Sequence, residues 1–164
     1  MAKGGTPALV MLEAAGVAFT VTEFHHEPGE GNYGLVAAHA LGIEPERVFK
    51  TLVANLTTDT GVEQVVAIVP VSGQLSLREL AACLCGKRAE MCPVDLAQRL
   101  TGYVVGGISP FGQKKRLRTA IDETCVLFDT IFVSGGKRGL DIEIAPDDLV
   151  SVLSAVVAPI GTDR

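Results

Sequence analysis

Two long apolar segments, residues 48–56 and 62–71, are separated only by the polar sequence Thr57-Thr58-Asp59-Thr60-Gly61. Both segments are rich in valine, leucine and isoleucine, which is typical of β-strands. A short polar connection that ends in glycine allows two such strands to pair with each other. The sequence therefore predicts a hairpin near the middle of a sheet, and the rest of the fold must be built around it.

Helices are expected on both sides of this hairpin. Residues 8–15 follow Thr6-Pro7, a capping residue with proline at the first helical position, and they end at Gly16. Residues 33–41 carry apolar side chains at helical spacing and end at Gly42. Three further helices are expected to begin at the capping box Ser76-Leu77-Arg78-Glu79, at Pro93 and at Ala145-Pro146.

Further strands are expected at residues 17–24, 127–133 and 140–144, and the second of these should end at Gly135-Gly136. The sequence at 140–144 alternates strictly, which predicts a half-buried strand. Strands and helices do not alternate regularly along the chain. The expected fold class is therefore mixed α/β: a single domain over residues 1–164 with a largely antiparallel mixed sheet, curled toward a barrel and surrounded by helices.

Several classes of protein are excluded by the composition. No apolar run reaches the roughly 20 residues of a membrane-spanning helix, and the first residues lack the apolar core of a secretory signal. A cytoplasmic protein without membrane contact is expected, with a monomer as the simplest state. Its four cysteines, which should be reduced thiols, are too irregularly spaced to favour a zinc site: Cys83, Cys85, Cys92 and Cys125.

The net charge of −5 argues against a nucleic-acid partner, because phosphate binding depends on lysine and arginine. The average conceals a basic segment, residues 112–139, which holds six of the fourteen basic residues. These six are Lys114, Lys115, Arg116, Arg118, Lys137 and Arg138. From charge alone, an ordinary solvated surface and a nucleic-acid contact both remain open.

Lys50 interrupts the first apolar strand, within Phe49-Lys50-Thr51-Leu52. Burial of an unpaired ammonium costs on the order of several kcal/mol, so a lysine inside an apolar strand is usually paired or functional. Successive side chains of a strand alternate between its two faces, so a solvent-exposed Lys50 fits the same pattern. The pattern leaves both interpretations open.

Other polar residues give weaker signals. Gly106-Gly107 and Ser134-Gly135-Gly136 could each bring backbone N–H groups close to a carbonyl or phosphate oxygen, or could be tight turns. His25 and His26 lie in an expected chain break at residues 25–29, and His39 lies on an expected helix surface. No Ser-His-Asp arrangement or catalytic cysteine is indicated.

Four motifs in order carry a resemblance to a known family: Phe-Lys-Thr-Leu at 49–52, Thr-Gly-Tyr-Val-Val-Gly-Gly-Ile-Ser-Pro-Phe-Gly at 101–112, Lys-Lys-Arg at 114–116, and Val-Ser-Gly-Gly-Lys-Arg-Gly-Leu-Asp-Ile-Glu-Ile at 133–144. The chain resembles the YbaK-type aminoacyl-tRNA deacylases over nearly its full length. These are free-standing relatives of the editing domain of bacterial prolyl-tRNA synthetases. The resemblance implies an enzyme without metal or cofactor that removes cysteine from proline-specific tRNA.

The resemblance also implies roles for single residues. Lys50 matches the family's indispensable lysine and would hold the aminoacyl ester or the neighbouring phosphate. Phe24 stands where many relatives carry a tyrosine, so that hydroxyl is missing here. The expected substrate-binding residues are Phe24, Thr51, Gly106, Gly107, Ser134, Gly135 and Asp141. The expected tRNA contacts are Lys114, Lys115, Arg116, Lys137 and Arg138.

The family's proposed mechanism suits a chain without an evident nucleophile. The thiol of a cysteinyl ester would attack its own carbonyl, with proximity replacing a protein nucleophile and backbone N–H groups near Gly106 stabilising the oxyanion. Specificity for the tRNA would come partly from a complex with prolyl-tRNA synthetase. Two alternatives stay open: deacylation of another residue such as alanine by an activated water, and a module that binds tRNA or a synthetase without chemistry.

Overall fold

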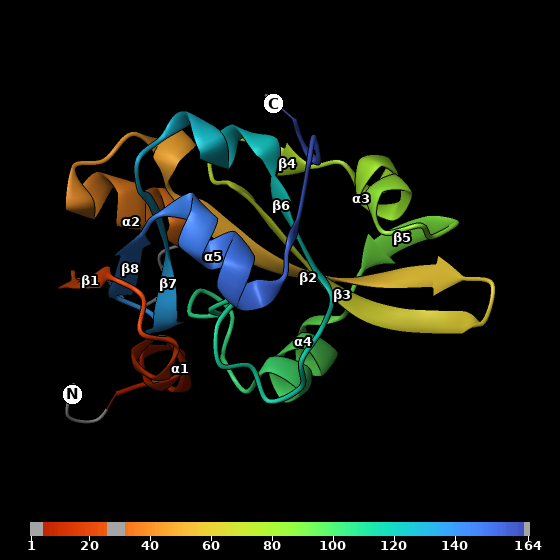
Figure 1. The fold of residues 1–164 in the computed structure, drawn as a ribbon, viewed down its shortest axis with the longest axis horizontal. Coiled ribbons are helices and arrows are strands. Elements are labelled where there is room, and N and C mark those ends of the chain that lie inside the picture. The colour runs from red at the N-terminus through yellow and green to blue at the C-terminus, as the bar shows by residue number, and fades with distance from the viewer. Residues whose placement is uncertain (1–4, 26–31, 163–164) are drawn as a thin grey trace.

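The computed structural model describes residues 5–25 and 32–162, so most of the expected chain break at 25–29, including His26, lies outside the described residues. Figure 1 shows the β2–β3 hairpin projecting at one end of the long axis, with β1, β7, β8, α1 and α2 gathered at the other. The helices are α1 Pro7–Ala15, α2 Tyr33–Leu41, α3 Leu77–Cys83, α4 Val94–Thr101 and α5 Pro146–Leu153, with 3-10 turns η1 Pro45–Arg47 and η2 Glu123–Leu127. No described helix is long and apolar enough to cross a membrane.

The strands form a five-stranded sheet of order β5-β2-β3-β6-β9, a three-stranded sheet of order β1-β8-β7 and a two-stranded pair of β10 with β4. Their bounds are β1 Phe19–Glu23, β2 Phe49–Thr58, β3 Gly61–Pro70, β4 Gln74–Leu75, β5 Arg88–Met91, β6 Thr119–Asp122, β7 Ile131–Lys137, β8 Leu140–Ile144, β9 Val156–Ala158 and β10 Gly161–Thr162. Among the described strand pairs, only β3–β6 and β6–β9 are parallel. The predicted mixed α/β class with a largely antiparallel sheet is confirmed, although the sheet remains open.

The central hairpin forms as predicted. β2 and β3 pair antiparallel along their full length, with Lys50 opposite Val69 and Thr58 opposite Gly61. Both strands have sheet neighbours on their outer sides because β5 pairs with β2 and β6 pairs with β3. Both faces of β3 are also buried, because Val66 and Ile68 pack in one core cluster while Val65, Ala67 and Val69 pack in another. Burial on both faces explains the nearly continuous apolar runs.

The helix ends follow the capping residues in the sequence. The Thr6 hydroxyl accepts a hydrogen bond from the Leu9 amide at 3.4 Å, and Ser76 accepts one from the Glu79 amide at 3.2 Å. Gly16 and Gly42 end α1 and α2 with φ of 72° and 68°, in the left-handed region where glycine is favoured. The predicted helices are therefore confirmed, and α1, α2 and α3 have capping contacts at their ends, whereas α4 and α5 begin at the expected prolines without a side-chain cap.

The strand expected at 127–133 is wrong at both ends. Leu127 belongs to η2, and β7 runs from Ile131 through both glycines to Lys137. The register of β7 against β8 shifts between Ser134 and Lys137, so a β-bulge lets the strand continue past Gly135 and Gly136. The short strands β5, β6 and β9 were not expected, because each depends on pairing with a segment far away in the sequence.

The two larger sheets are joined at the start of β2. Val48 forms an isolated parallel bridge with Phe132 of β7. Nearby, the Arg47 guanidinium donates to the Thr130 carbonyl at 2.8 Å and to the Glu143 carboxylate at 3.2 Å. These contacts fix β8 relative to β2 and so set the distance across the space between them.

Candidate functional site

A pocket of about 360 Å³ lies beside the first half of β2, where that strand faces α2, β8 and the chain before α4. We call it the β2 pocket. Six residues expected from the sequence to form a site line it: Phe24, Lys50, Thr51, Gly106, Ser134 and Asp141. Pockets of this size bind small ligands or parts of larger ones. The tertiary structure thus brings together residues from five separate segments of the chain.

The β2 pocket exists because one edge of β2 is only partly paired. β5 covers Ala54 to Thr57, and the Val53 carbonyl accepts from the Cys92 amide at 3.1 Å. The backbone groups of alternate residues point to the same side of a strand, so the N–H and C=O of Thr51 point the same way as those of Val53. At Thr51 no described strand continues the ladder on that side. Both backbone groups of Thr51 therefore face the β2 pocket.

The Thr51 side chain is also without a partner. Its hydroxyl is buried, and no described residue forms a hydrogen bond with it. Thr51 as a whole is 9% exposed. A buried polar atom without a hydrogen bond costs stability, which makes such atoms uncommon in folded proteins.

Lys50 is half-buried at the wall of the β2 pocket rather than fully exposed. Burial lowers the pKa of its ammonium below the usual range. Among the described residues, no carboxylate forms an ion pair with it. The strand pattern left open whether Lys50 is exposed to solvent or belongs to a site, and in the structure Lys50 faces a pocket.

Asp141 is the second residue of β8, opposite Thr22 of β1 and Ser134 of β7. The predicted half-buried strand is more buried than its alternation suggests, and the Asp141 residue is only 6% exposed. Burial raises the pKa of its carboxyl to about 7, and no described cation opposes the effect. This side chain is a carboxyl that lacks a counter-ion within the described part of the chain.

Gly106 adopts a φ of +89°, and a side chain there would have no room. An added Cβ would lie 2.6 Å from Cδ2 of Tyr33 and 3.0 Å from Nε of Arg138. Arg138 itself packs over Tyr33, with Cζ 4.4 Å from the ring centroid. Glycine is required at position 106 because the stacked pair fills that space.

The other expected glycines lie outside the lining of the β2 pocket. The Gly107 amide donates to the Val104 carbonyl at 2.8 Å, and a Cβ at Gly107 would lie 2.7 Å from Cα of Lys137. Gly135 packs against Leu140, and its carbonyl accepts a hydrogen bond from the Thr6 hydroxyl. The Gly107–Val104 bond closes a tight turn, which is one of the alternatives that the sequence left open. Gly135 lies within β7 instead, where it permits close packing against Leu140.

Three residues in the wall of the β2 pocket were not predicted from the sequence. Tyr33, Met91 and Cys92 line the β2 pocket, although none belongs to a motif that stood out. Cys92 is 8% exposed, and burial raises the pKa of its thiol, so it is a poor nucleophile. Of the two described histidines, His25 and His39, neither lines the pocket.

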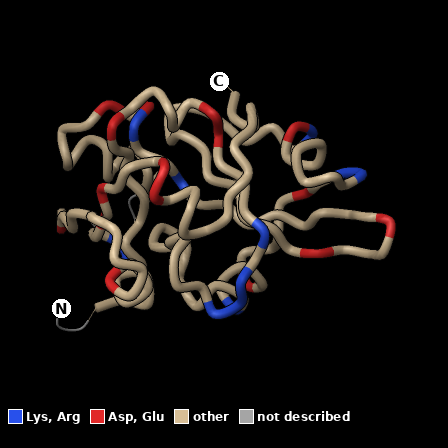
Figure 2. The backbone as a smooth tube through the Cα atoms, in the orientation of Figure 1, with Lys and Arg blue, Asp and Glu red and all other residues tan. Residues whose placement is uncertain are grey.

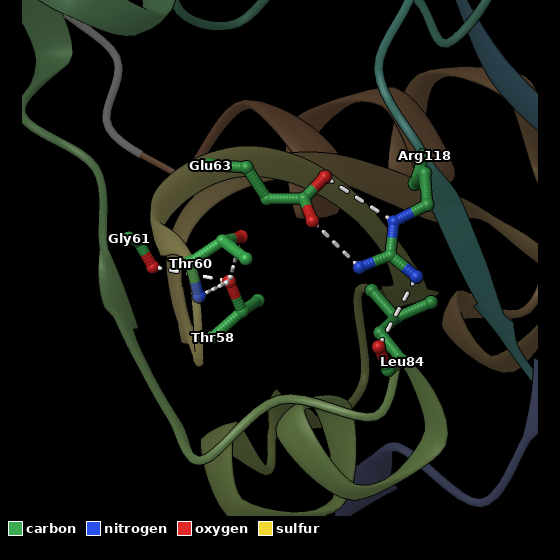
Figure 3. A network of polar contacts seen from close by, with 6 residues as sticks. All are labelled: Thr58, Thr60, Gly61, Glu63, Leu84 and Arg118. Atoms are coloured by element: carbon green, nitrogen blue, oxygen red, sulfur yellow. Dashed lines mark hydrogen bonds and ion pairs between the residues drawn. The ribbon is translucent and has the colours of Figure 1, made fainter.

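The residues of the basic segment have two different roles in the structure. Figure 2 shows lysine and arginine gathered along the loop that precedes β6, where Lys114, Lys115 and Arg116 are exposed. Arg118 instead binds Glu63 of the hairpin at 2.7 Å and the Leu84 carbonyl at 3.1 Å (Figure 3). Arg118 therefore anchors β3 and α3, whereas its neighbours in the loop point to solvent. Lys137 is exposed, and Arg138 lies at the β2 pocket.

Comparison with known proteins gives concordant results. The model of the aminoacyl-tRNA editing domain family matches residues 35–152, which include Lys50, Gly106, Ser134 and Asp141. A protein of Enterococcus faecalis named "Putative Cys-tRNA(Pro)/Cys-tRNA(Cys) deacylase EbsC" is 38% identical over 157 residues, covering 96% of this chain and 93% of the relative.

Two solved structures share the fold. One, described as "a putative trans-editing enzyme for prolyl tRNA synthetase", has a TM-score of 0.81 and 22% identity, with 99% of each chain covered. Another, described as "hypothetical protein APE2540", has a TM-score of 0.83 and 22% identity, covering 96% of this chain and 100% of that one. At this identity the two structures establish the shared architecture.

Proposed function

The chain belongs to the aminoacyl-tRNA editing domain family, and we propose that it is a trans-acting deacylase that removes cysteine from mischarged tRNA, with Cys-tRNA(Pro) as its substrate. The amino acid follows from the 38% identical relative, whose name gives cysteine on two tRNAs. The proposed tRNA identity would be set partly by prolyl-tRNA synthetase acting as a partner. The prediction of a monomer stays a prediction.

The observation that carries this proposal is the presence of two unpaired ionisable groups in one pocket. Lys50 and Asp141 both line the β2 pocket, and no described residue neutralises either of them. The end of an aminoacyl-tRNA presents an α-amine next to an ester, with a phosphate beyond the ribose. Such a ligand could place its amine at Asp141 and its ester or phosphate at Lys50. Each group would then gain the partner that it lacks in the free protein.

The pocket walls also bear on the chemistry. The Cys92 thiol donates to the Pro93 carbonyl at 3.5 Å, and Ser134 Oγ accepts from the Gly136 amide at 3.2 Å. Neither side chain has a described basic partner that would activate it. The absence of an activated protein nucleophile among the described pocket residues favours attack by a group on the substrate.

The proposed step uses the thiol of the cysteinyl ester. Its sulfur forms a bond to the carbonyl carbon, the bond from that carbon to the ribose 3′ oxygen breaks, and the thiol proton ends on the released hydroxyl. The products are a cyclic thioester of cysteine and free tRNA. A pocket that folds the short side chain toward its own carbonyl supplies the rate gain of an intramolecular reaction.

The free backbone edge of β2 gives this step an electrostatic partner. The carbonyl oxygen becomes an oxyanion as sulfur attacks, and a preorganised N–H donor stabilises it. The Thr51 N–H faces the β2 pocket beside Lys50, so it supplies such a donor. The sequence suggested N–H groups near Gly106 for this role, and of these the Gly107 N–H is already bound to Val104.

Single-turnover deacylation of Cys-tRNA(Pro) tests the proposal. We expect Lys50→Ala to lower the rate at least about 100-fold, as losses of electrostatic stabilisation do, while circular dichroism shows an intact fold. Lys50→Arg keeps the charge and serves as the matched control, with partial activity expected. A folded Lys50→Ala variant with wild-type rates would contradict the proposal.

A second comparison tests the role of the substrate thiol. Cysteinyl, S-methyl-cysteinyl and alanyl esters on the same tRNA are expected to react only in the first case. Rapid loss of the alanyl ester would instead support the alternative in which water is activated. Protein that shifts tRNA mobility without accelerating ester loss would support the binding-module alternative. Cys-tRNA(Cys) belongs in the same series, because the relative's name includes it.

A further inference from the structure

An arginine at the rim of the β2 pocket has its guanidinium plane fixed by neighbouring residues. Arg138 follows β7 and is exposed, yet it lines the pocket, so it lies at the opening. Its guanidinium packs over the Tyr33 ring at 4.4 Å, and its Nε–H donates to the Val105 carbonyl at 2.8 Å. Gly106 leaves the space for this arrangement by having no side chain. Three separate segments of the chain therefore cooperate to fix one planar group.

The fixed group has unused binding capacity. Tyr33 takes one face of the guanidinium, and Val105 takes the Nε donor. No described carboxylate forms an ion pair with Arg138, and no described acceptor binds its two Nη atoms. Because Arg138 is exposed at the pocket opening, its second face and its Nη donors can reach a ligand. A structural arginine would normally use these donors within the protein, as Arg118 does with Glu63 and Leu84.

We propose that the stacked Arg138 and Tyr33 form a subsite for the terminal nucleoside of the tRNA acceptor end. The base lies on the free face of the guanidinium, and the Nη donors bind the 5′-phosphate of the same nucleotide. Unpaired bases in RNA commonly stack on arginine planes and aromatic rings. This inference rests on the proposed deacylase function, which it deepens by assigning a place to the nucleoside next to the ester.

The position of the platform fits the substrate. Arg138 stands three residues before Asp141, at the start of the turn into β8. Asp141 is almost fully buried, whereas Arg138 is exposed. A ligand could thus place its amine inward at Asp141 and its base outward at the rim, with the ester between them near Lys50. A simple phosphate contact needs only the charge of Arg138, whereas stacking also needs its plane.

The test uses two stable amide probes. One is 3′-cysteinylamino-3′-deoxyadenosine 5′-phosphate, and the other carries the same cysteinyl amide and phosphate on an abasic ribose. Calorimetry gives the dissociation constant of each probe. For the wild type we expect the adenosine probe to bind about tenfold more tightly than the abasic probe, which is the scale of one stacked base. The ratio of the two dissociation constants is the readout, because general damage to the fold weakens the binding of both probes to the same extent.

Variants distinguish stacking on the guanidinium plane of Arg138 from a contact that needs only its positive charge. Arg138→Lys keeps the charge, and we expect it to reduce the ratio to about one, on the scale of losing one stacked base. Tyr33→Phe keeps the ring and should preserve the ratio, whereas Tyr33→Leu should lower it. Arg88→Lys is the matched control, since Arg88 is an exposed arginine on β5 that does not line the pocket.

Two outcomes would overturn the subsite: equal binding of both probes by the wild type, or an unchanged ratio in Arg138→Lys. Either result leaves turnover of Cys-tRNA(Pro) as a separate measurement. Loss of the proposed function would show instead as a wild type that deacylates no aminoacyl-tRNA, and the probe ratio would still be measurable. The two failures are therefore distinguishable.

Discussion

Lys50 on β2 and Asp141 on β8 line the same pocket, and neither forms an ion pair with the other or with any other described residue. Burial lowers the pKa of the Lys50 ammonium and raises that of the Asp141 carboxyl to about 7. Both effects disfavour the charged forms in the free protein. This cost is the kind that binding sites commonly carry, because a ligand with complementary groups relieves it.

The buried carboxyl makes stability depend on pH. The pKa of Asp141 is raised from 3.8 to about 7 on folding, so the folded chain holds this proton more tightly than the unfolded chain does. The free energy of unfolding should fall as pH rises from about 4 to about 7, by on the order of 4 kcal/mol. We expect Asp141→Asn to remove this contribution. Urea unfolding of both proteins at pH 5 and pH 8 measures it, and identical pH dependence would count against the burial of this charge.

The unpaired hydroxyl of Thr51 predicts opposite effects on stability and activity. Thr51→Val removes a buried polar atom that has no partner, so the free energy of unfolding should rise by about 1 kcal/mol. If the substrate supplies the missing partner, kcat/KM should fall. Thr119→Val is the matched control, because the Thr119 hydroxyl donates to the Leu117 carbonyl at 3.1 Å and its loss should destabilise. Equal destabilisation by both changes would contradict this view of Thr51.

Gly106 should tolerate no side chain. Gly106→Ala introduces a Cβ 2.6 Å from the Tyr33 ring, in addition to the strain of a φ of +89°. We expect loss of the stacked Arg138 and a deacylation rate at least about tenfold lower, as small displacements in an active site can cause. Gly16→Ala has a similar φ of +72° but no atom within 4 Å, so it isolates the backbone strain, on the order of 1 kcal/mol. Rapid kinetics and thermal unfolding of both variants separate the two effects.

The exposed loop cations should contact RNA through charge alone. Reversal of Lys114, Lys115 and Arg116 to glutamate should weaken tRNA binding, and the slope of log K against log salt should become shallower by roughly 0.9 for each lost contact. The matched control reverses three exposed cations elsewhere, Arg78, Lys87 and Arg88, for the same change in net charge. Filter binding at several salt concentrations measures both. Equal losses in the two variants would show that only net charge matters.

Much of the local structure could be predicted because its causes are local. The hairpin follows from two apolar runs around a polar turn, and the ends of α1, α2 and α3 follow from residues such as Thr6 and Ser76 that satisfy free amides nearby. The family motifs likewise pointed to six residues that do share one pocket. The hairpin and the helix ends depend on residues close together in sequence, where periodicity and capping act, whereas the six pocket residues were predicted from the family resemblance.

The remaining features were decided by segments that meet only in the folded chain. Whether Lys50 faced solvent or a pocket depended on the distant segments that line the pocket with it, which include α2 and β8. Gly135 and Gly136 stay within β7 because β8 pairs across a bulge, and Asp141 is buried because β1 and β7 flank it. Arg118 and Arg138, twenty residues apart in one basic segment, acquired different partners in the hairpin and in α2. Alternation specifies which face a side chain occupies, and only tertiary packing determines what that face meets.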